Sequence, residues 1–113
     1  MKNNDLAMTL AEKLSERKAT DVTVINIGEK SSFADFFVNA TAGSDRQLAA
    51  LGDYAEDVAL ELGLEIRSAT GRTGAGWVLV DCGDIIVNIF TETMREKYAL
   101  DKLWSDCETT HIA

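Results

Sequence analysis

The acidic side chains of this chain are the first candidates for chemistry. Asp35 follows a turn, an arrangement that resembles the turn and carboxylate of nucleotidyltransferases. Transfer of a nucleotide needs two carboxylates on one strand face, normally two positions apart, to hold Mg²⁺ against a triphosphate. The residue two positions after Asp35 is Phe37, so a metal site would require Asp81 or Asp84 beside Asp35. This single carboxylate favours a protein that is not an enzyme and holds no metal.

The two cysteines and the only histidine form no catalytic or metal-binding set. Cys82 lies in an apolar run far along the chain from His111, which argues against an activated nucleophile. Cys107 and His111 supply only two of the four ligands of a structural zinc site. Because the chain has no C-x-x-C pair, we expect both cysteines to be free thiols in a reducing compartment. No cofactor is predicted.

The glycine-rich segment 70–76, TGRTGAG, could in principle cradle a phosphate. It lacks the Gly-Lys-Ser/Thr ending of a phosphate-binding loop, and it leads into a predicted strand where such a loop leads into a helix. We therefore interpret it as a mobile surface loop.

Large aromatic side chains gather in the C-terminal part of the chain, at Trp77, Phe90, Tyr98 and Trp104. Aromatic residues are more often core than contact, yet Trp and Tyr are also the usual anchors of protein interfaces. Trp77 directly follows the glycine loop and Trp104 directly precedes a predicted tail, so both lie at element ends where partial exposure is common. This concentration of rings without catalytic groups indicates a surface that binds a partner, although composition alone does not separate core from contact.

Charged residues near these rings also have two interpretations. Glu92, Arg95, Glu96 and Lys97 have the spacing of a solvated helix face. Asp84 either bonds the backbone of a hairpin turn or presents its carboxylate to a basic partner.

The charge of the whole chain restricts its partners. Eleven basic and nineteen acidic residues give a formal net charge of −8, which repels phosphate backbones and argues against nucleic-acid binding. A basic protein surface would attract it. The first apolar stretch contains acids, and no apolar run approaches about 18 residues, so we predict neither a signal peptide nor a membrane span and a cytoplasmic location.

Apolar periodicity and capping signals predict the helices. They cover residues 5–18, 44–62 and 91–98, with a further helical turn over 100–104. Ser44 and Gln47 form a capping box, in which the serine hydroxyl accepts from an early N–H and the glutamine returns to the serine backbone. Gly63 suits the left-handed end of the second helix, and Thr91 can cap the third.

Runs of apolar and β-branched residues predict five strands, over 22–27, 36–41, 64–69, 77–82 and 85–90. The last two form a hairpin around Gly83 and Asp84. The order α-β-β-α-β-β-β-α indicates an α/β (α+β) fold, a five-stranded mixed sheet flanked by helices. At 113 residues the chain suits one domain, which we place at 1–106 with a loose C-terminal tail over 107–113.

A series of short segments carries a family resemblance. They are Ser32-Phe33-Ala34-Asp35-Phe36-Phe37-Val38, Gly43-Ser44 with Arg46-Gln47, Gly76-Trp77-Val78-Leu79-Val80-Asp81, Gly83-Asp84, Val87, Ile89-Phe90, Arg95, Tyr98, Leu100 and Leu103-Trp104. In this succession the chain resembles the ribosomal silencing factor family, also called Iojap-like, over residues 5–106.

The resemblance implies a nucleotidyltransferase-like fold without transferase activity. It further implies binding to the large ribosomal subunit through its protein number fourteen, on the face that meets the small subunit. Such binding blocks subunit joining and represses translation when nutrients are limiting. Free members of the family are expected to form homodimers. The matched binding positions are Trp77, Asp84, Phe90, Arg95, Tyr98, Leu100 and Trp104.

The sequence departs from the family pattern at two positions. Asn88 stands where histidine is common, and Cys82 stands where tyrosine is common. Asn88 keeps a donor and an acceptor, whereas Cys82 gives up aromatic area. Three hypotheses follow: a steric block of the ribosome, a nucleotidyltransferase-like enzyme that uses Asp35, and a dimer-only module that uses the same apolar surface.

Overall fold

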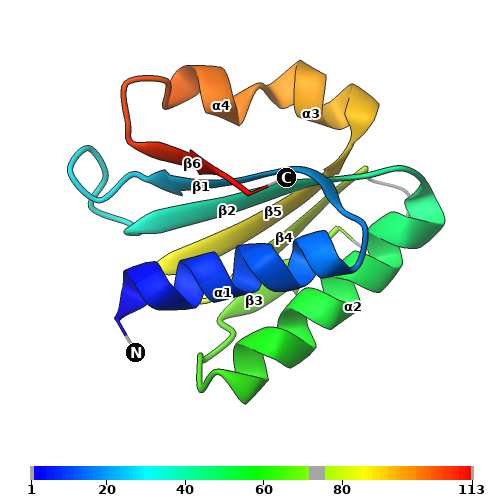
Figure 1. Ribbon diagram of the computed structural model, residues 1–113, viewed down its shortest axis with the longest axis horizontal. Helices are drawn as coiled ribbons and strands as arrows, with labels where there is room; N and C mark the ends of the chain where they lie inside the picture. The colour runs from blue at the N-terminus through cyan, green and yellow to red at the C-terminus, as the bar shows by residue number, and fades with distance from the viewer. Residues whose placement is uncertain (1, 72–75, 113) are drawn as a thin grey trace.

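The computed structural model describes residues 2–71 and 76–112, except the side chains of residues 100 and 101. Figure 1 shows one mixed sheet with helices on both faces. The elements in chain order are α1 (Asn3–Glu16), β1 (Thr20–Asn26), β2 (Phe36–Ala42), α2 (Asp45–Glu61), β3 (Ser68–Thr70), β4 (Trp77–Asp81), β5 (Ile85–Thr91), α3 (Glu92–Tyr98), α4 (Leu100–Leu103) and β6 (Thr109–His111). The predicted class, a mixed sheet flanked by helices, is confirmed.

Over the described residues the sheet has six strands, in the order β3-β4-β5-β2-β1-β6, so the predicted count of five is wrong. The sixth strand comes from the segment expected to be a loose tail, because Thr110 pairs with Val24 in an antiparallel ladder on β1. Among the described strands, β2 and β5 are the one parallel pair, and their register places Asn39 opposite Asn88 in the middle of the sheet. β3 is also shorter than predicted, beginning at Ser68.

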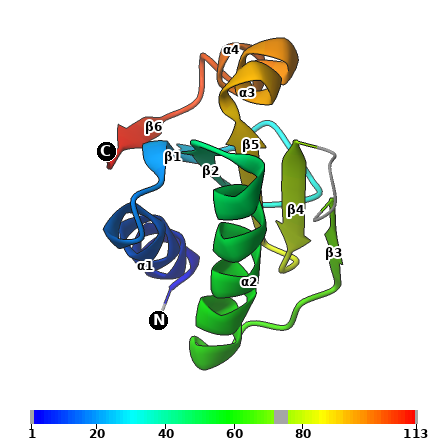
Figure 2. The ribbon, with the colours of Figure 1, turned by 90° about the vertical axis from the view of Figure 1, so that its right-hand side faces the viewer.

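The two faces of the sheet are covered differently. Figures 1 and 2 show α1 and α2 together on one face and α3 with α4 on the other. The larger core lies under α1 and α2, and it includes Leu10, Leu14 and Leu51 together with the strand residues that point to this side. A smaller cluster on the other face joins Ile25, Ile27, Ala34, Phe37 and Ile86 to the half-buried Leu79, Trp104 and Cys107. The short helices leave part of this second face accessible.

Local signals in the sequence explain the element ends. Ser44 Oγ accepts the N–H of Gln47 at 3.1 Å, as the capping box predicts. The glutamine side chain, however, accepts from the N–H of Gly43 at 2.6 Å, and the predicted return to the serine backbone is wrong. Gly63 ends α2 with φ +81°, as predicted. Thr91 occupies the N-cap position of α3 without a capping bond from its side chain.

The predicted hairpin is confirmed, with Trp77 opposite Phe90 and Asp81 opposite Ile86. Within the described ranges 2–71 and 76–112, no helix has the length and apolar character needed to cross a membrane.

Candidate partner-binding surface

Three aromatic rings form a cluster at the start of β4, which we call the Trp77 cluster (Trp77, Phe90 and Tyr98). Trp77 stacks on Phe90 from the neighbouring strand, with ring centroids 5.1 Å apart and 29° between the planes. The ring of Tyr98 lies on Trp77 from α3, at 4.7 Å. Phe90 is only 1% exposed, Trp77 is half-buried and Tyr98 is 43% exposed. In the monomer, the buried ring of Phe90 therefore supports one side of the Trp77 ring, and Tyr98 is the most exposed ring of the cluster.

An apolar cavity of about 340 Å³ adjoins this cluster. Its lining comes from β4, α3 and the end of β3: Thr70, Gly71, Trp77, Leu79, Met94 and Tyr98. A Cβ at Gly71 would lie 1.8 Å from the carbonyl oxygen of Trp77, so only glycine permits this close approach of the two backbone segments. The loop was predicted over 70–76, but Thr70 ends β3; Gly71 and Gly76 follow and precede residues 72–75, which lie outside the described part.

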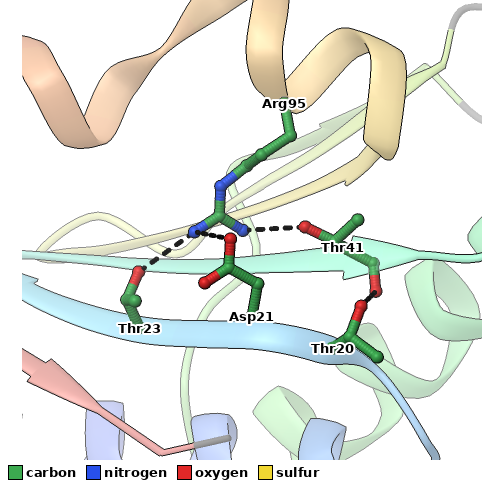
Figure 3. Close-up of polar contacts among 5 residues, drawn as sticks. All are labelled: Thr20, Asp21, Thr23, Thr41 and Arg95. Atoms are coloured by element: carbon green, nitrogen blue, oxygen red, sulfur yellow. Dashed lines mark hydrogen bonds and ion pairs between the residues drawn. The ribbon is translucent and has the colours of Figure 1, made fainter.

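Arg95 points from α3 into the sheet, as Figure 3 shows. Its guanidinium donates to the hydroxyl of Thr41 at 3.1 Å and to that of Thr23 at 3.4 Å, and it lies 3.7 Å from the Asp21 carboxylate. A bulge in β1 between Thr20 and Thr23 and a left-handed φ of +48° accompany this placement of Asp21. Arg95 is 8% exposed, so its predicted place on a solvated helix face is wrong. The charge is buried because Arg95 reaches from α3 onto β1 and β2, where the hydroxyls of Thr23 and Thr41 accept from it.

A second group of aromatic rings, which we call the Trp104 cluster, consists of Phe33, Phe37 and Trp104, the residue that directly follows α4. Trp104 packs edge-on against Phe37 at 5.8 Å and against Phe33 at 6.4 Å. Its indole nitrogen is buried without a hydrogen-bond partner. Phe33 is 59% exposed and the neighbouring Leu103 is 70% exposed, and sequence reasoning assigned a role to neither side chain. Leu100 lies in α4, and its side chain is outside the described part.

Asp84 lies at the hairpin turn, at the opposite end of β4 and β5 from Trp77. Its carboxylate accepts from the amide of Asn3 at 3.2 Å, and the same amide donates to Asp35 at 3.1 Å. The turn itself is stabilised by Asp81, which accepts the N–H of Gly83 at 2.8 Å, so the assignment of this role to Asp84 is wrong. The fold thus brings Asp84 beside Asp35, with a neutral amide bonded to both carboxylates.

The acids, the histidine and the cysteines of the described residues form no cluster of metal ligands, and Cys82 is buried. Among those residues, no set of three or more His, Cys, Asp or Glu side chains could hold a metal ion. Burial, and to a smaller extent the neighbouring Asp81 carboxylate, raise the pKa of the Cys82 thiol from 9.0 to about 11. Cys82 therefore carries little thiolate at neutral pH, and both cysteines are free.

Six of the seven predicted binding residues fall into two groups toward opposite ends of the sheet, and the side chain of the seventh, Leu100, lies outside the described part. The structure brings together Trp77, Phe90, Arg95 and Tyr98 at one end of the sheet, and it places Asp84 and Trp104 toward the other. Sequence reasoning missed the polar contact of Trp77, whose indole N–H donates to Asn88 at 3.1 Å. The signal available was Asn88 itself, an amide in the middle of an apolar run.

Comparison with known proteins gives consistent results along the whole chain. The family described as "Ribosomal silencing factor during starvation" matches residues 1–113. The ribosomal silencing factor RsfS of Halalkalibacterium halodurans is 35% identical over 112 residues, covering 99% of this chain and 96% of that protein. The RsfS of Bacillus subtilis is 32% identical over 106 residues, covering 94% and 90%. A crystal structure of a Chromobacterium violaceum protein superposes with a TM-score of 0.88 at 28% identity, covering 93% of this chain and 88% of that one.

Proposed function

Because this chain belongs to the ribosomal silencing factor family, we propose that it binds the large ribosomal subunit and blocks its association with the small subunit. The proposed contact is protein number fourteen of the large subunit. Repression of translation when nutrients are limiting would follow, because a large subunit that carries this protein cannot form a complete ribosome. The proposed place of action is the cytoplasm.

The observation that carries this proposal is the exposed side of the Trp77 cluster. Tyr98 is 43% exposed and lies on Trp77, which in turn lies on the fully buried Phe90. Aromatic anchors held rigidly beside an apolar cavity are the usual centre of a protein interface. Of the seven candidate residues, Trp77 and Tyr98 are therefore the proposed contacts, and Phe90 and Arg95 the proposed supports.

The proposed mechanism is steric and needs no catalysis. The fold is proposed to be nucleotidyltransferase-like without transferase activity, and the amide of Asn3 bonds both carboxylates, Asp35 and Asp84, that a metal would otherwise need. The net charge of −8 favours a basic protein as the direct contact and disfavours ribosomal RNA. Turnover of labelled nucleotides with Mg²⁺, abolished by Asp35→Asn, would replace this proposal with an enzyme.

Sedimentation with purified ribosomal subunits tests the block. The double variant Trp77→Ala/Tyr98→Ala should weaken binding to large subunits by about 2 kcal/mol or more, about thirtyfold, and should lose the inhibition of subunit joining. The matched control is Leu60→Ala, because Leu60 is 60% exposed on α2, which covers the other face of the sheet. The wild type should sediment with free large subunits and not with joined ribosomes. Full inhibition by the folded double variant would reject this surface.

We also propose that the free protein forms a homodimer through the same apolar surface. Dimerisation should then compete with binding to large subunits as the protein concentration rises. Variants that lose one association and keep the other would show two separate surfaces.

A further inference from the structure

Two buried asparagine side chains lie in the middle of the sheet, next to Trp77. Asn39 on β2 and Asn88 on β5 stand directly opposite each other in the parallel ladder. Asn88 Nδ2 donates to Asn39 Oδ1 at 3.1 Å, and Asn88 Oδ1 accepts the indole N–H of Trp77 at 3.1 Å. Asn39 is 0% exposed and Asn88 is 1% exposed. A hydrogen-bonded chain therefore runs from the sheet centre to the indole ring.

The stability of the sheet does not by itself explain a pair of amides at this position. The next pair along the same two strands on this face consists of Phe37 and Ile86, which are both apolar. A buried amide costs free energy unless its groups are paired, and an apolar pair would avoid that cost. What the amides provide, and an apolar pair cannot, is an acceptor fixed in direction at the edge of the Trp77 ring.

We propose that Asn88, oriented by Asn39, is a positioning residue that fixes Trp77 in the orientation required for partner binding. The inference rests on the proposed function, because it assumes that the Trp77 cluster contacts the partner. With its indole N–H held by Asn88, the Trp77 ring keeps one placement on Phe90, and Tyr98 packs on it from α3. A ring that is already ordered loses less conformational entropy when the partner binds.

Two substitutions separate positioning from simple packing. Asn88→Leu has a similar size but removes the acceptor of the Trp77 indole N–H and the donor to the Asn39 side-chain oxygen. Asn88→His keeps the chemistry, because a neutral imidazole can accept from Trp77 with one nitrogen and donate to Asn39 with the other. Val38→Ala is the control for stability alone, since Val38 is 0% exposed and belongs to the core under α1 and α2.

The experiment combines a ¹H–¹⁵N spectrum of the indole groups with affinity for purified large subunits, at a temperature where all variants are folded. The chain has two tryptophans, so Trp104→Phe assigns the Trp77 signal. Asn88→Leu should shift that signal, speed its exchange with solvent, and weaken binding about tenfold. Asn88→His should restore binding to within about threefold, while Val38→Ala leaves the signal in place and weakens binding by less than about threefold.

The proposal is overturned by an unmoved Trp77 signal in Asn88→Leu. It is also overturned if the affinity of Asn88→Leu for large subunits equals that of the wild type or that of Val38→Ala. The same holds if Asn88→His binds as weakly as Asn88→Leu. Trp77→Ala serves as the reference for the proposed function. If Trp77→Ala weakens binding and Asn88→Leu does not, only the positioning role fails; if Trp77→Ala binds normally, the proposed surface fails.

Discussion

Arg95 shows how one buried charge can determine the position of a helix. Its guanidinium is bonded to hydroxyls on β1 and β2, while its backbone belongs to α3, the helix that carries Tyr98. Because the side chain of Asp21 is 61% exposed, the ion pair itself contributes little, and the buried hydroxyl contacts contribute more. Arg95 thus stabilises the placement of α3 on the sheet without being a surface residue.

Replacing Arg95 by methionine should therefore lower the free energy of unfolding by about 2 kcal/mol, since hydrogen bonds to a charged group are lost. Lys97→Met on the same helix is the matched control, because Lys97 is exposed, and it should change the free energy by less than about 0.5 kcal/mol. Urea unfolding followed by circular dichroism measures both values. Equal losses in the two variants would mean that Arg95 does not hold α3.

Cys82 should give the protein a stability that depends on pH in the alkaline range. Its pKa in the folded chain, about 11, lies above the ordinary value of 9.0, so the unfolded chain releases this proton first. The free energy of unfolding should therefore fall as the pH rises from 9 to 11. Unfolding curves recorded at about pH 8, 9, 10 and 11 should show a smaller fall in the free energy of unfolding for Cys82→Ala than for the wild type.

The same burial predicts a difference between the two thiols. At about pH 8, iodoacetamide should alkylate Cys107 much faster than Cys82, because the thiolate is the reacting species. Mass spectrometry of the digested protein identifies which thiol reacted. Faster alkylation of Cys82 would contradict its buried, protonated state.

At the level of elements, β6 connects the end of the chain to the far edge of the sheet. The Asn26 N–H donates to the Glu108 carbonyl at 2.9 Å and the Ile112 N–H donates to the Val22 carbonyl at 2.8 Å, with Thr110 paired to Val24 between them. Without β6, β1 would be an exposed edge strand.

Thr110→Pro should lower the free energy of unfolding by about 2 kcal/mol, because proline has no N–H to donate to the ladder. Thr110→Val keeps the N–H and the β-branched shape, so it should unfold like the wild type. Deletion of residues 107–113 should cost at least as much as the proline, and it should promote aggregation through the edge of β1. If the deletion leaves the unfolding midpoint unchanged, the end of the chain is a loose tail after all.

The sequence predicts those elements whose signals are local. The hairpin, the Ser44 cap and the Gly63 helix end follow from a few adjacent residues, and the structure has them where expected. β6 was missed because three residues between Glu108 and Ile112 become a strand only by pairing with β1. The burial of Arg95 was missed for a related reason, since helical spacing places a side chain on a face but does not say what covers that face.

In the whole molecule, the two faces of the sheet have different roles. Figure 2 shows α1 and α2 closing one face, where most of the large core lies. The other face carries both aromatic clusters and the exposed side chains Phe33, Tyr98 and Leu103. The molecule measures 33 × 30 × 23 Å. The face covered by α1 and α2 contains most of the core that stabilises the fold, and the other face is the one proposed to contact the partner.

This division predicts where charge matters for association with a basic partner. Binding to purified ribosomal protein number fourteen should weaken as the salt concentration rises from about 0.05 to about 0.3 M, mainly through a slower association rate, because salt screens attraction between separated charges. The double variant Glu92→Gln/Glu96→Gln, on exposed positions of α3, should reduce this salt dependence. Glu61→Gln/Glu65→Gln removes the same charge at and just after the end of α2, and it should preserve most of the dependence. Equal effects of the two pairs, measured by stopped-flow association, would mean that net charge alone guides the encounter and that α3 does not face the partner.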